Sequence, residues 1–224
     1  MHETYEIVLK IRRHDPDNER SWIQRYQLEA GRILRFTDLF RKINKELDAT
    51  LAWNSSCEHG QCGTCSVKIN GKPMLACELL VENAVAHFET NEFLIEPLTI
   101  APVVRDLIVD FDIAYERVHK IKPYIIEPVE NPNSGNEYKI SPRHLERYVD
   151  ATRCINCFCC ATACISSHHN FLDPLVGFVE IYDQIPNHRR NRQRLNQKFG
   201  CLEMCNCIFH QQLAGQHWLA VNFY

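Results

Sequence analysis

The run Cys57-Glu58-His59-Gly60-Gln61-Cys62-Gly63-Thr64-Cys65 decides the fold and the chemistry of the first half of the chain. Its two glycines permit unusual dihedral angles and a close approach of the backbone to a bound group. A fourth cysteine, Cys77, follows a hairpin predicted from the turn signal Asn70-Gly71. Because this turn sets Cys65 opposite Ala76, we expect Cys77 to return beside the cysteine-rich loop.

The spacing Cys-x4-Cys-x2-Cys with a distant fourth cysteine is that of a plant-type [2Fe–2S] site. We therefore predict that this cluster is bound by Cys57, Cys62, Cys65 and Cys77. The alternative is a zinc site in a non-redox interaction module, which metal analysis would distinguish by finding zinc without iron or acid-labile sulfide.

Composition narrows the class of protein. The chain has 224 residues, 12 cysteines and a formal net charge of -3. A general nucleic-acid binder would carry a basic excess, so this class is excluded. The start, Met1-His2-Glu3, has neither a basic nor an apolar signal region, so we expect no signal peptide and reduced cysteines that serve as metal ligands. The longest uncharged stretch, Met204 to Tyr224, is too polar for a transmembrane helix.

Periodicity predicts a small β-rich domain around the cysteine loop. Apolar residues alternate from Tyr5 to Ile11, and Trp22 to Leu28 is a plausible partner strand. Thr37 is predicted to cap a helix with Leu39, Phe40, Ile43 and Leu47 on one face. With the hairpin, these elements predict a β-grasp domain over residues 1–104. Apolar residues at helical spacing also predict a helix from Val103 to His119.

The second group of cysteines opens with Cys154-x2-Cys157-x2-Cys160-x3-Cys164. This is the run of bacterial ferredoxins, in which the first three cysteines bind one cubane and the fourth binds a second cluster. We therefore predict a [4Fe–4S] cluster on Cys154, Cys157 and Cys160, in a helical domain over residues 105–224. Cys159 lies outside the pattern and is predicted to be a spare buried thiol.

A second run, Cys201-x2-Met204-x2-Cys207-x3-Gln211, fits the same template with two of its cysteines missing. Cys164, Cys201 and Cys207 offer three thiolates, which favours a [3Fe–4S] cluster. The fourth ligand of the [4Fe–4S] cluster stays open among Cys205, His210 and Gln211. Cys205 is alternatively a ligand that converts the three-cysteine site to [4Fe–4S].

These motifs resemble the iron–sulfur subunit of succinate dehydrogenase and fumarate reductase, in the same order and spacing. Further matching segments are Asn70 to Cys77, Arg105-Asp106-Leu107, Asn170 to Pro174 and Phe199-Gly200-Cys201. The resemblance implies an α+β chain: an N-terminal β-grasp plant-type [2Fe–2S] ferredoxin domain followed by a C-terminal α-helical, bacterial-ferredoxin-like domain. It also implies a relay through [2Fe–2S], [4Fe–4S] and [3Fe–4S] clusters, without substrate catalysis by this chain.

The family's partners follow from the same resemblance. They are a flavoprotein subunit that holds FAD and handles succinate or fumarate, one or more membrane-anchor subunits, and a quinone near the [3Fe–4S] cluster. Ser166 and His169 occupy the quinone-proximal positions. The implied location is peripheral on the cytoplasmic face of the plasma membrane, or the mitochondrial matrix face in a eukaryote. The alternative is the same relay in a soluble thiol-linked fumarate reductase or a glycolate-oxidase type enzyme.

Overall fold

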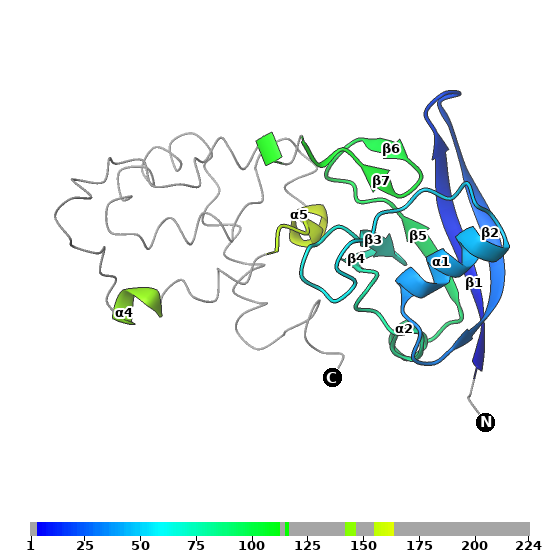
Figure 1. The fold of residues 1–224 in the computed structure, drawn as a ribbon, viewed down its shortest axis with the longest axis horizontal. Helices are drawn as coiled ribbons and strands as arrows, with labels where there is room; N and C mark the ends of the chain where they lie inside the picture. The colour runs from blue at the N-terminus through cyan, green and yellow to red at the C-terminus, as the bar shows by residue number, and fades with distance from the viewer. Residues whose placement is uncertain (1–3, 113–114, 117–141, 147–154, 164–224) are drawn as a thin grey trace.

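A five-stranded mixed sheet forms the centre of the first domain (Figure 1). The computed structural model describes residues 4–112, 115–116, 142–146 and 155–163. Strand order is β2-β1-β5-β3-β4, with β1 and β5 parallel and the other neighbours antiparallel. The sheet strands are β1 (Thr4–Asp15), β2 (Arg20–Gly31), β3 (Ser66–Ile69), β4 (Lys72–Leu75) and β5 (Glu92–Glu96). The same domain contains two helices, α1 (Phe36–Glu46) and α2 (Val81–Phe88).

Alternation along β1 explains how the sheet and α1 share one core. Ile7, Leu9 and Ile11 are fully buried, as the period of two predicts. Phe36 of α1 meets Phe93 of β5 edge to face, with ring centroids 5.2 Å apart. Each such buried side chain contributes about 1.5–3 kcal/mol relative to exposure. The predicted strands are therefore confirmed, and β5, which pairs in parallel with β1 and makes the sheet mixed, is an additional finding.

The start of α1 differs from the prediction. The N-cap is Arg35, whose backbone N–H donates to Oδ2 of Asp38 at 2.9 Å. Thr37 instead lies inside the helix and is buried in the core. Leu47 is the C-cap and is 53% exposed. The prediction missed the start because the carboxylate that satisfies the N-terminal amide comes from inside the helix, not from a residue before it.

The hairpin formed by β3 and β4 has the predicted turn and register. Asn70 and Gly71 both have positive φ angles, 47° and 79°, as a type I′ turn requires. Ser66 pairs with Leu75, and the N–H of Ala76 donates to the carbonyl of Cys65 at 3.2 Å. The third and fourth cysteines are thereby brought to the same end of the hairpin.

Residues 103–109 form two short strands, β6 (Val103–Arg105) and β7 (Ile108–Val109), so the helix predicted from Val103 is wrong over this range. Asp106, which lies between them, has a φ of 48°, and no position of a right-handed helix has such an angle. The residue is also buried. Its ion pair with Arg13 of β1 fixes the turn against the sheet, and Leu107 joins the core of the first domain. The domain division at residues 104 and 105 stays a prediction.

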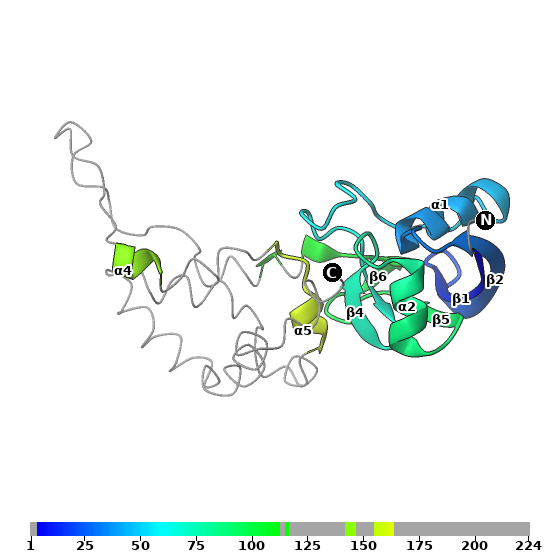
Figure 2. The same cartoon turned by 90° about the horizontal axis from the view of Figure 1, so that it is seen from below.

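Two further short helices are described, α4 (Pro142–Leu145) and α5 (Cys159–Ala163). Helix α5 lies beside β4, as both views of the ribbon show (Figures 1 and 2). The ring of Phe158 stacks on Phe111 with centroids 5.6 Å apart, and Cys159 is buried as predicted. The following predicted site residues lie outside the described residues: Cys154, Cys164, Ser166, His169, Cys201, Cys205, Cys207, His210 and Gln211.

Candidate metal centre

The loop from Cys57 to Cys65 is shaped by three residues with left-handed backbone angles. Glu58, Gly60 and Gly63 have φ values of 59°, 72° and 73°. Regular helices and strands do not place residues in this region, so the loop curls on itself. Several of its backbone amides therefore face inward, toward cysteine sulfur atoms.

Each of the four sulfur atoms accepts a hydrogen bond. Backbone N–H groups of Gly60, Gln61 and Cys77 donate to three of them, and the hydroxyl of Thr64 donates to the fourth. The distances are 3.3 Å from Gly60 N to Cys77 Sγ, 3.3 Å from Gln61 N to Cys57 Sγ, 3.4 Å from Cys77 N to Cys65 Sγ and 3.1 Å from Thr64 Oγ1 to Cys62 Sγ. Such donors favour thiolates, the form in which cysteine binds metals.

The four cysteines approach one another in two pairs. The thiols of Cys57 and Cys62 interact and are half-buried, whereas the interacting thiols of Cys65 and Cys77 are buried. The hydrogen bond from Thr64 lowers the pKa of Cys62 to about 6. Within the buried pair, the Cys65 thiol donates to Cys77, which lowers the pKa of Cys77 to about 7 and raises that of Cys65. One thiolate of each pair is therefore favoured before any metal binds.

Two pairs of sulfur atoms fit a two-iron cluster. A [2Fe–2S] cluster has four cysteine ligands for two irons, so two thiolates serve each iron. A mononuclear zinc site requires four ligands around one point, with sulfur atoms about 2.3 Å from the ion. Over residues 4–112, 115–116, 142–146 and 155–163, no three Cys, His, Asp or Glu side chains are grouped around one ion position. The two cysteine pairs offer the four thiolates that a two-iron cluster requires.

Arg35 joins the loop to the end of the hairpin. Its Nη1 donates to the carbonyl of Glu58 at 2.8 Å and to the carbonyl of Cys77 at 2.9 Å. The carboxylate of Glu58 is itself held by Arg41 and by Ser55 Oγ at 2.8 Å. One guanidinium therefore fixes the separation between the two parts of the chain that supply the cysteines.

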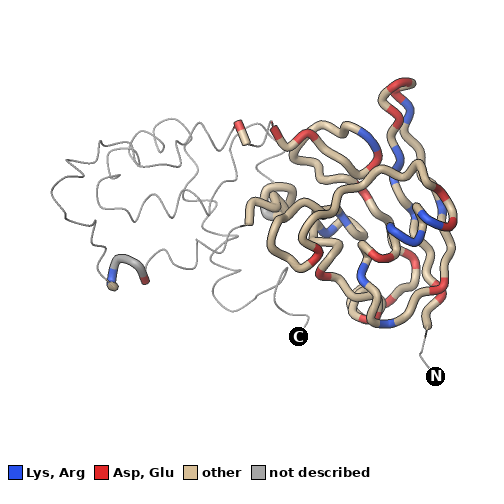
Figure 3. The backbone as a smooth tube through the Cα atoms, viewed as in Figure 1, with Lys and Arg blue, Asp and Glu red and all other residues tan. Residues whose placement is uncertain are grey.

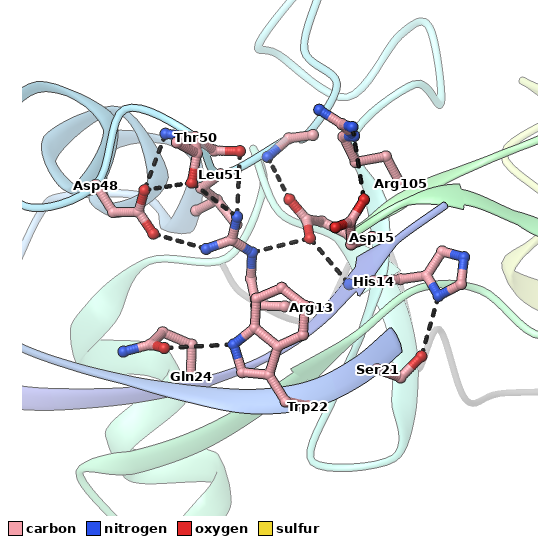
Figure 4. Close-up of polar contacts among 12 residues, drawn as sticks. Arg13, His14, Asp15, Ser21, Trp22, Gln24, Asp48, Thr50, Leu51 and Arg105 are labelled. Carbon is pink, nitrogen blue, oxygen red and sulfur yellow. Dashed lines mark hydrogen bonds and ion pairs between the residues drawn. The ribbon is translucent and has the colours of Figure 1, made fainter. Parts of the chain in front are cut away.

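A buried guanidinium fixes the chain that leads into the loop (Figure 4). Arg13 of β1 is 4% exposed, and its Nη1 lies 2.6 Å from Oδ2 of Asp48. Its Nη2 donates to the carbonyl of Thr50 at 3.2 Å, and its Nε forms an ion pair with Asp106 at 2.8 Å. Asp106 also accepts a hydrogen bond at 2.8 Å from the N–H of Ala52, five residues before Cys57. The sheet, the segment before the loop and the β6–β7 turn thus share one charge network.

The carboxylate of Asp48 shows the strength of this network. Burial raises its pKa, but hydrogen bonds from Thr50, Tyr26 and Arg13 outweigh burial and hold the pKa below its ordinary value. The ionised form is therefore the one that the folded protein stabilises.

A segment of the second cysteine run lies directly against the loop. An added Cβ on Gly63 would stand only 2.8 Å from Cα of Cys157, and Ile155 and Cys157 pack against the first domain's core. Asn156 and Phe158, on either side of Cys157, both have a φ of 57°. The residues 155–163 carry no charged side chain, which Figure 3 shows as a tan segment at α5. Two cysteine-bearing loops thus meet, and the one from the second cysteine run brings no charged side chain to the contact.

Several residues of the centre were not predicted from the sequence. The hydroxyl of Thr64 lies between two predicted ligands, and its position alone signalled a possible donor to sulfur. Arg13 continues the inward-facing series of β1 at an interval of two, so its burial with a carboxylate partner was readable from the strand period. Nothing in the sequence indicated that Arg35 would contact the carbonyls of Glu58 and Cys77, because these contacts depend on how distant segments pack.

Comparison with known proteins gives three related findings. Residues 8–116 match the family described as the 2Fe-2S iron-sulfur cluster binding domain. The fumarate reductase iron-sulfur subunit of Mycobacterium tuberculosis is 32% identical over 159 residues, which are 70% of this chain and 63% of the relative. A mitochondrial succinate dehydrogenase [ubiquinone] iron-sulfur subunit 2 of Oryza sativa subsp. japonica is 32% identical over 171 residues, 74% of this chain and 54% of the relative. The chain thus spans less than two thirds of either relative.

A solved structure gives a fourth comparison. A chain of the Mycobacterium smegmatis Sdh1 complex in the apo form superposes with a TM-score of 0.75 at 25% identity. The match covers 91% of this chain and 87% of that chain.

Proposed function

The chain is related to the iron–sulfur subunits of fumarate reductase and succinate dehydrogenase, and on this premise we propose that it relays electrons between a flavoprotein subunit and a membrane quinone. Its similarity to these subunits and to a 2Fe-2S domain supports an electron-transfer role. The chain supplies binding, distance and insulation, and substrate chemistry belongs to the flavoprotein.

The first cluster of the proposed relay is a [2Fe–2S] cluster on Cys57, Cys62, Cys65 and Cys77. The cluster, when bound, supplies one-electron oxidation and reduction. The backbone N–H groups of Gly60, Gln61 and Cys77 orient toward the sulfur atoms and stabilise negative charge on them. Burial of Cys65 and Cys77 keeps water from one side of the site. Arg35 and the Arg13 network hold the two cysteine-bearing parts at a fixed separation.

The second and third clusters are proposed for the remaining cysteines. Cys154, Cys157 and Cys160 would hold a [4Fe–4S] cluster, with a fourth ligand among Cys205, His210 and Gln211. The three-cysteine [3Fe–4S] site would use Cys164, Cys201 and Cys207. Support comes from the ferredoxin spacing and from the left-handed residues that flank Cys157, which curl that loop as the glycines curl the first. Proximity of Cys157 to Gly63 supports direct transfer between the first two clusters.

The relay is proposed to end at a quinone, with Ser166 and His169 near it, in a complex held on the membrane by anchor subunits. The proposed partner at the other end is a flavoprotein with FAD. Across the part of the chain that the structure describes, no helix has the length and apolar character to span a bilayer. A soluble flavoprotein that oxidises thiols is the alternative partner, and co-purification distinguishes the two.

The observation that carries the proposal is the arrangement of two cysteine pairs, three of whose members lie in the loop and the fourth at the end of the hairpin, with backbone amides directed at sulfur. The test is anaerobic purification of the full chain, followed by assay of iron, acid-labile sulfide and zinc. We expect iron and sulfide in near-equal amounts. Zinc without iron or sulfide would overturn the proposal and favour an interaction module instead.

A further inference from the structure

Thr64 lies in the loop between the second and third cysteines, and its side-chain hydroxyl contacts a cysteine sulfur. Its Oγ1 donates to Sγ of Cys62 at 3.1 Å, and its side chain is half-buried. The hydrogen bonds that this loop's backbone supplies to Cys57 and Cys77 survive any side-chain change. The Thr64 hydroxyl, in contrast, can be removed by a substitution that keeps the shape of the side chain.

A hydrogen bond at this sulfur acts on the reduced cluster more than on the oxidised one. Reduction adds one electron, and part of the added negative charge resides on the sulfur ligands. A donor aimed at such a sulfur lowers the free energy of the more negative state, and hydrogen bonds to sulfur are one of the determinants of cluster potentials. No bond forms or breaks in this step, and in the titration below dithionite supplies the electron.

We propose that Thr64 is a positioning residue that raises the reduction potential of the [2Fe–2S] cluster through its hydrogen bond to Cys62. The inference rests on the proposed function, because it requires that Cys62 is a cluster ligand. It adds a named side chain that sets how readily the first cluster accepts an electron from the flavoprotein.

Two substitutions separate the hydroxyl from the bulk of the side chain. Thr64→Val keeps the branched shape and removes the donor, whereas Thr64→Ser keeps the donor and removes the methyl group. Thr90→Val is the matched control, because Thr90 is also half-buried and its Oγ1 accepts a hydrogen bond from the N–H of Glu92 at 3.1 Å, a bond that involves none of the four sulfur atoms. The three variants and the parent are prepared as full chains with their clusters.

The measurement is a dithionite titration with redox mediators, followed by electron paramagnetic resonance (EPR) of the reduced [2Fe–2S] cluster. For Thr64→Val we expect the ratio of reduced to oxidised cluster at a fixed potential to fall about fivefold, since a hydrogen bond contributes about 1 kcal/mol. A tenfold change corresponds to about 59 mV for a one-electron couple. Thr64→Ser and Thr90→Val should stay within about twofold of the parent, a change smaller than the loss of one hydrogen bond would produce.

Failure of the inference and failure of the proposed function give different results. A parent protein without iron and sulfide contradicts the proposed function. An intact cluster whose potential does not change in Thr64→Val, or changes equally in Thr64→Ser, overturns the inference. If Thr64→Val assembles no cluster, pulsed electron–nuclear double resonance is the deciding measurement. An exchangeable proton that couples to the cluster in the parent and in Thr64→Ser, and that is lost in Thr64→Ala, supports the inference. Retention in Thr64→Ala overturns it.

Discussion

Alanine at Gly63 should separate the two cysteine-bearing loops, whereas alanine at Gly60 should not. Both glycines have nearly the same left-handed φ, 73° and 72°, so both substitutions incur about 1–2 kcal/mol of backbone strain. At Gly60 the new Cβ would meet the end of the Glu78 side chain, which can rotate away. At Gly63 it would meet the backbone of Cys157 at 2.8 Å, and ordinary contact begins at 3.4 Å, so that backbone must retreat by about 0.6 Å.

Such overpacking costs about 1–3 kcal/mol beyond the shared strain. Since 1.4 kcal/mol is a factor of ten, local opening of residues 155–163 should rise roughly tenfold in Gly63→Ala. Hydrogen–deuterium exchange with mass spectrometry measures this opening peptide by peptide in the full chain. Gly60→Ala should leave exchange of residues 155–163 within about twofold of the parent, because strain alone acts locally. Equal exchange of this peptide in both variants would refute the contact-based reasoning.

Three further predictions concern charge, pH and a ligand. Arg13→Met should lower the free energy of unfolding by about 3–5 kcal/mol in urea denaturation, because it leaves the buried Asp106 carboxylate without its cationic partner. The control is Arg12→Met, which breaks an exposed ion pair and should lower the free energy of unfolding by less than about 1 kcal/mol. Equal losses in the two variants would contradict the role of the Arg13 network. Because the pKa of Asp48 is lowered in the folded state, its stabilisation is complete above the unfolded value of about 3.9 and is lost as pH falls below it, so Asp48→Asn should flatten the acid branch of a stability–pH curve. An unchanged acid branch would contradict this linkage. Cys77→Ser should abolish visible absorption of the first cluster, and full retention would remove this residue from the ligand set.

Short sequence patterns correctly predicted the strands and turns that are determined by neighbouring residues. The Asn70-Gly71 turn, the alternation of β1 and the cysteine spacing each act within a few residues, and the hairpin and strands follow them. The helix expected from Val103 failed because Val104, Leu107 and Ile108 are apolar at helical intervals, while the decisive interaction is the ion pair of Asp106 with a residue more than 90 positions earlier. No window of sequence contains both partners.

The candidate site divides in the same way. Spacing selected the four cysteines of the first loop, and the structure brings them together in two pairs. The contact between Gly63 and Cys157 was not predicted, because it joins two runs that are separate in sequence. Spacing identifies which residues are able to bind a metal, whereas tertiary packing sets which cysteine-bearing loops lie close together.

Low-temperature EPR of the dithionite-reduced full chain tests the central claim most directly. The proposal predicts the signal of a reduced [2Fe–2S] cluster in the parent protein and in Cys159→Ser, whose buried thiol lies outside the ligand pattern. The same signal should be absent in Cys57→Ser. A parent protein that contains iron and sulfide but gives no reducible [2Fe–2S] signal, or a signal unchanged in Cys57→Ser, would contradict the assignment of this loop as the first cluster of an electron relay.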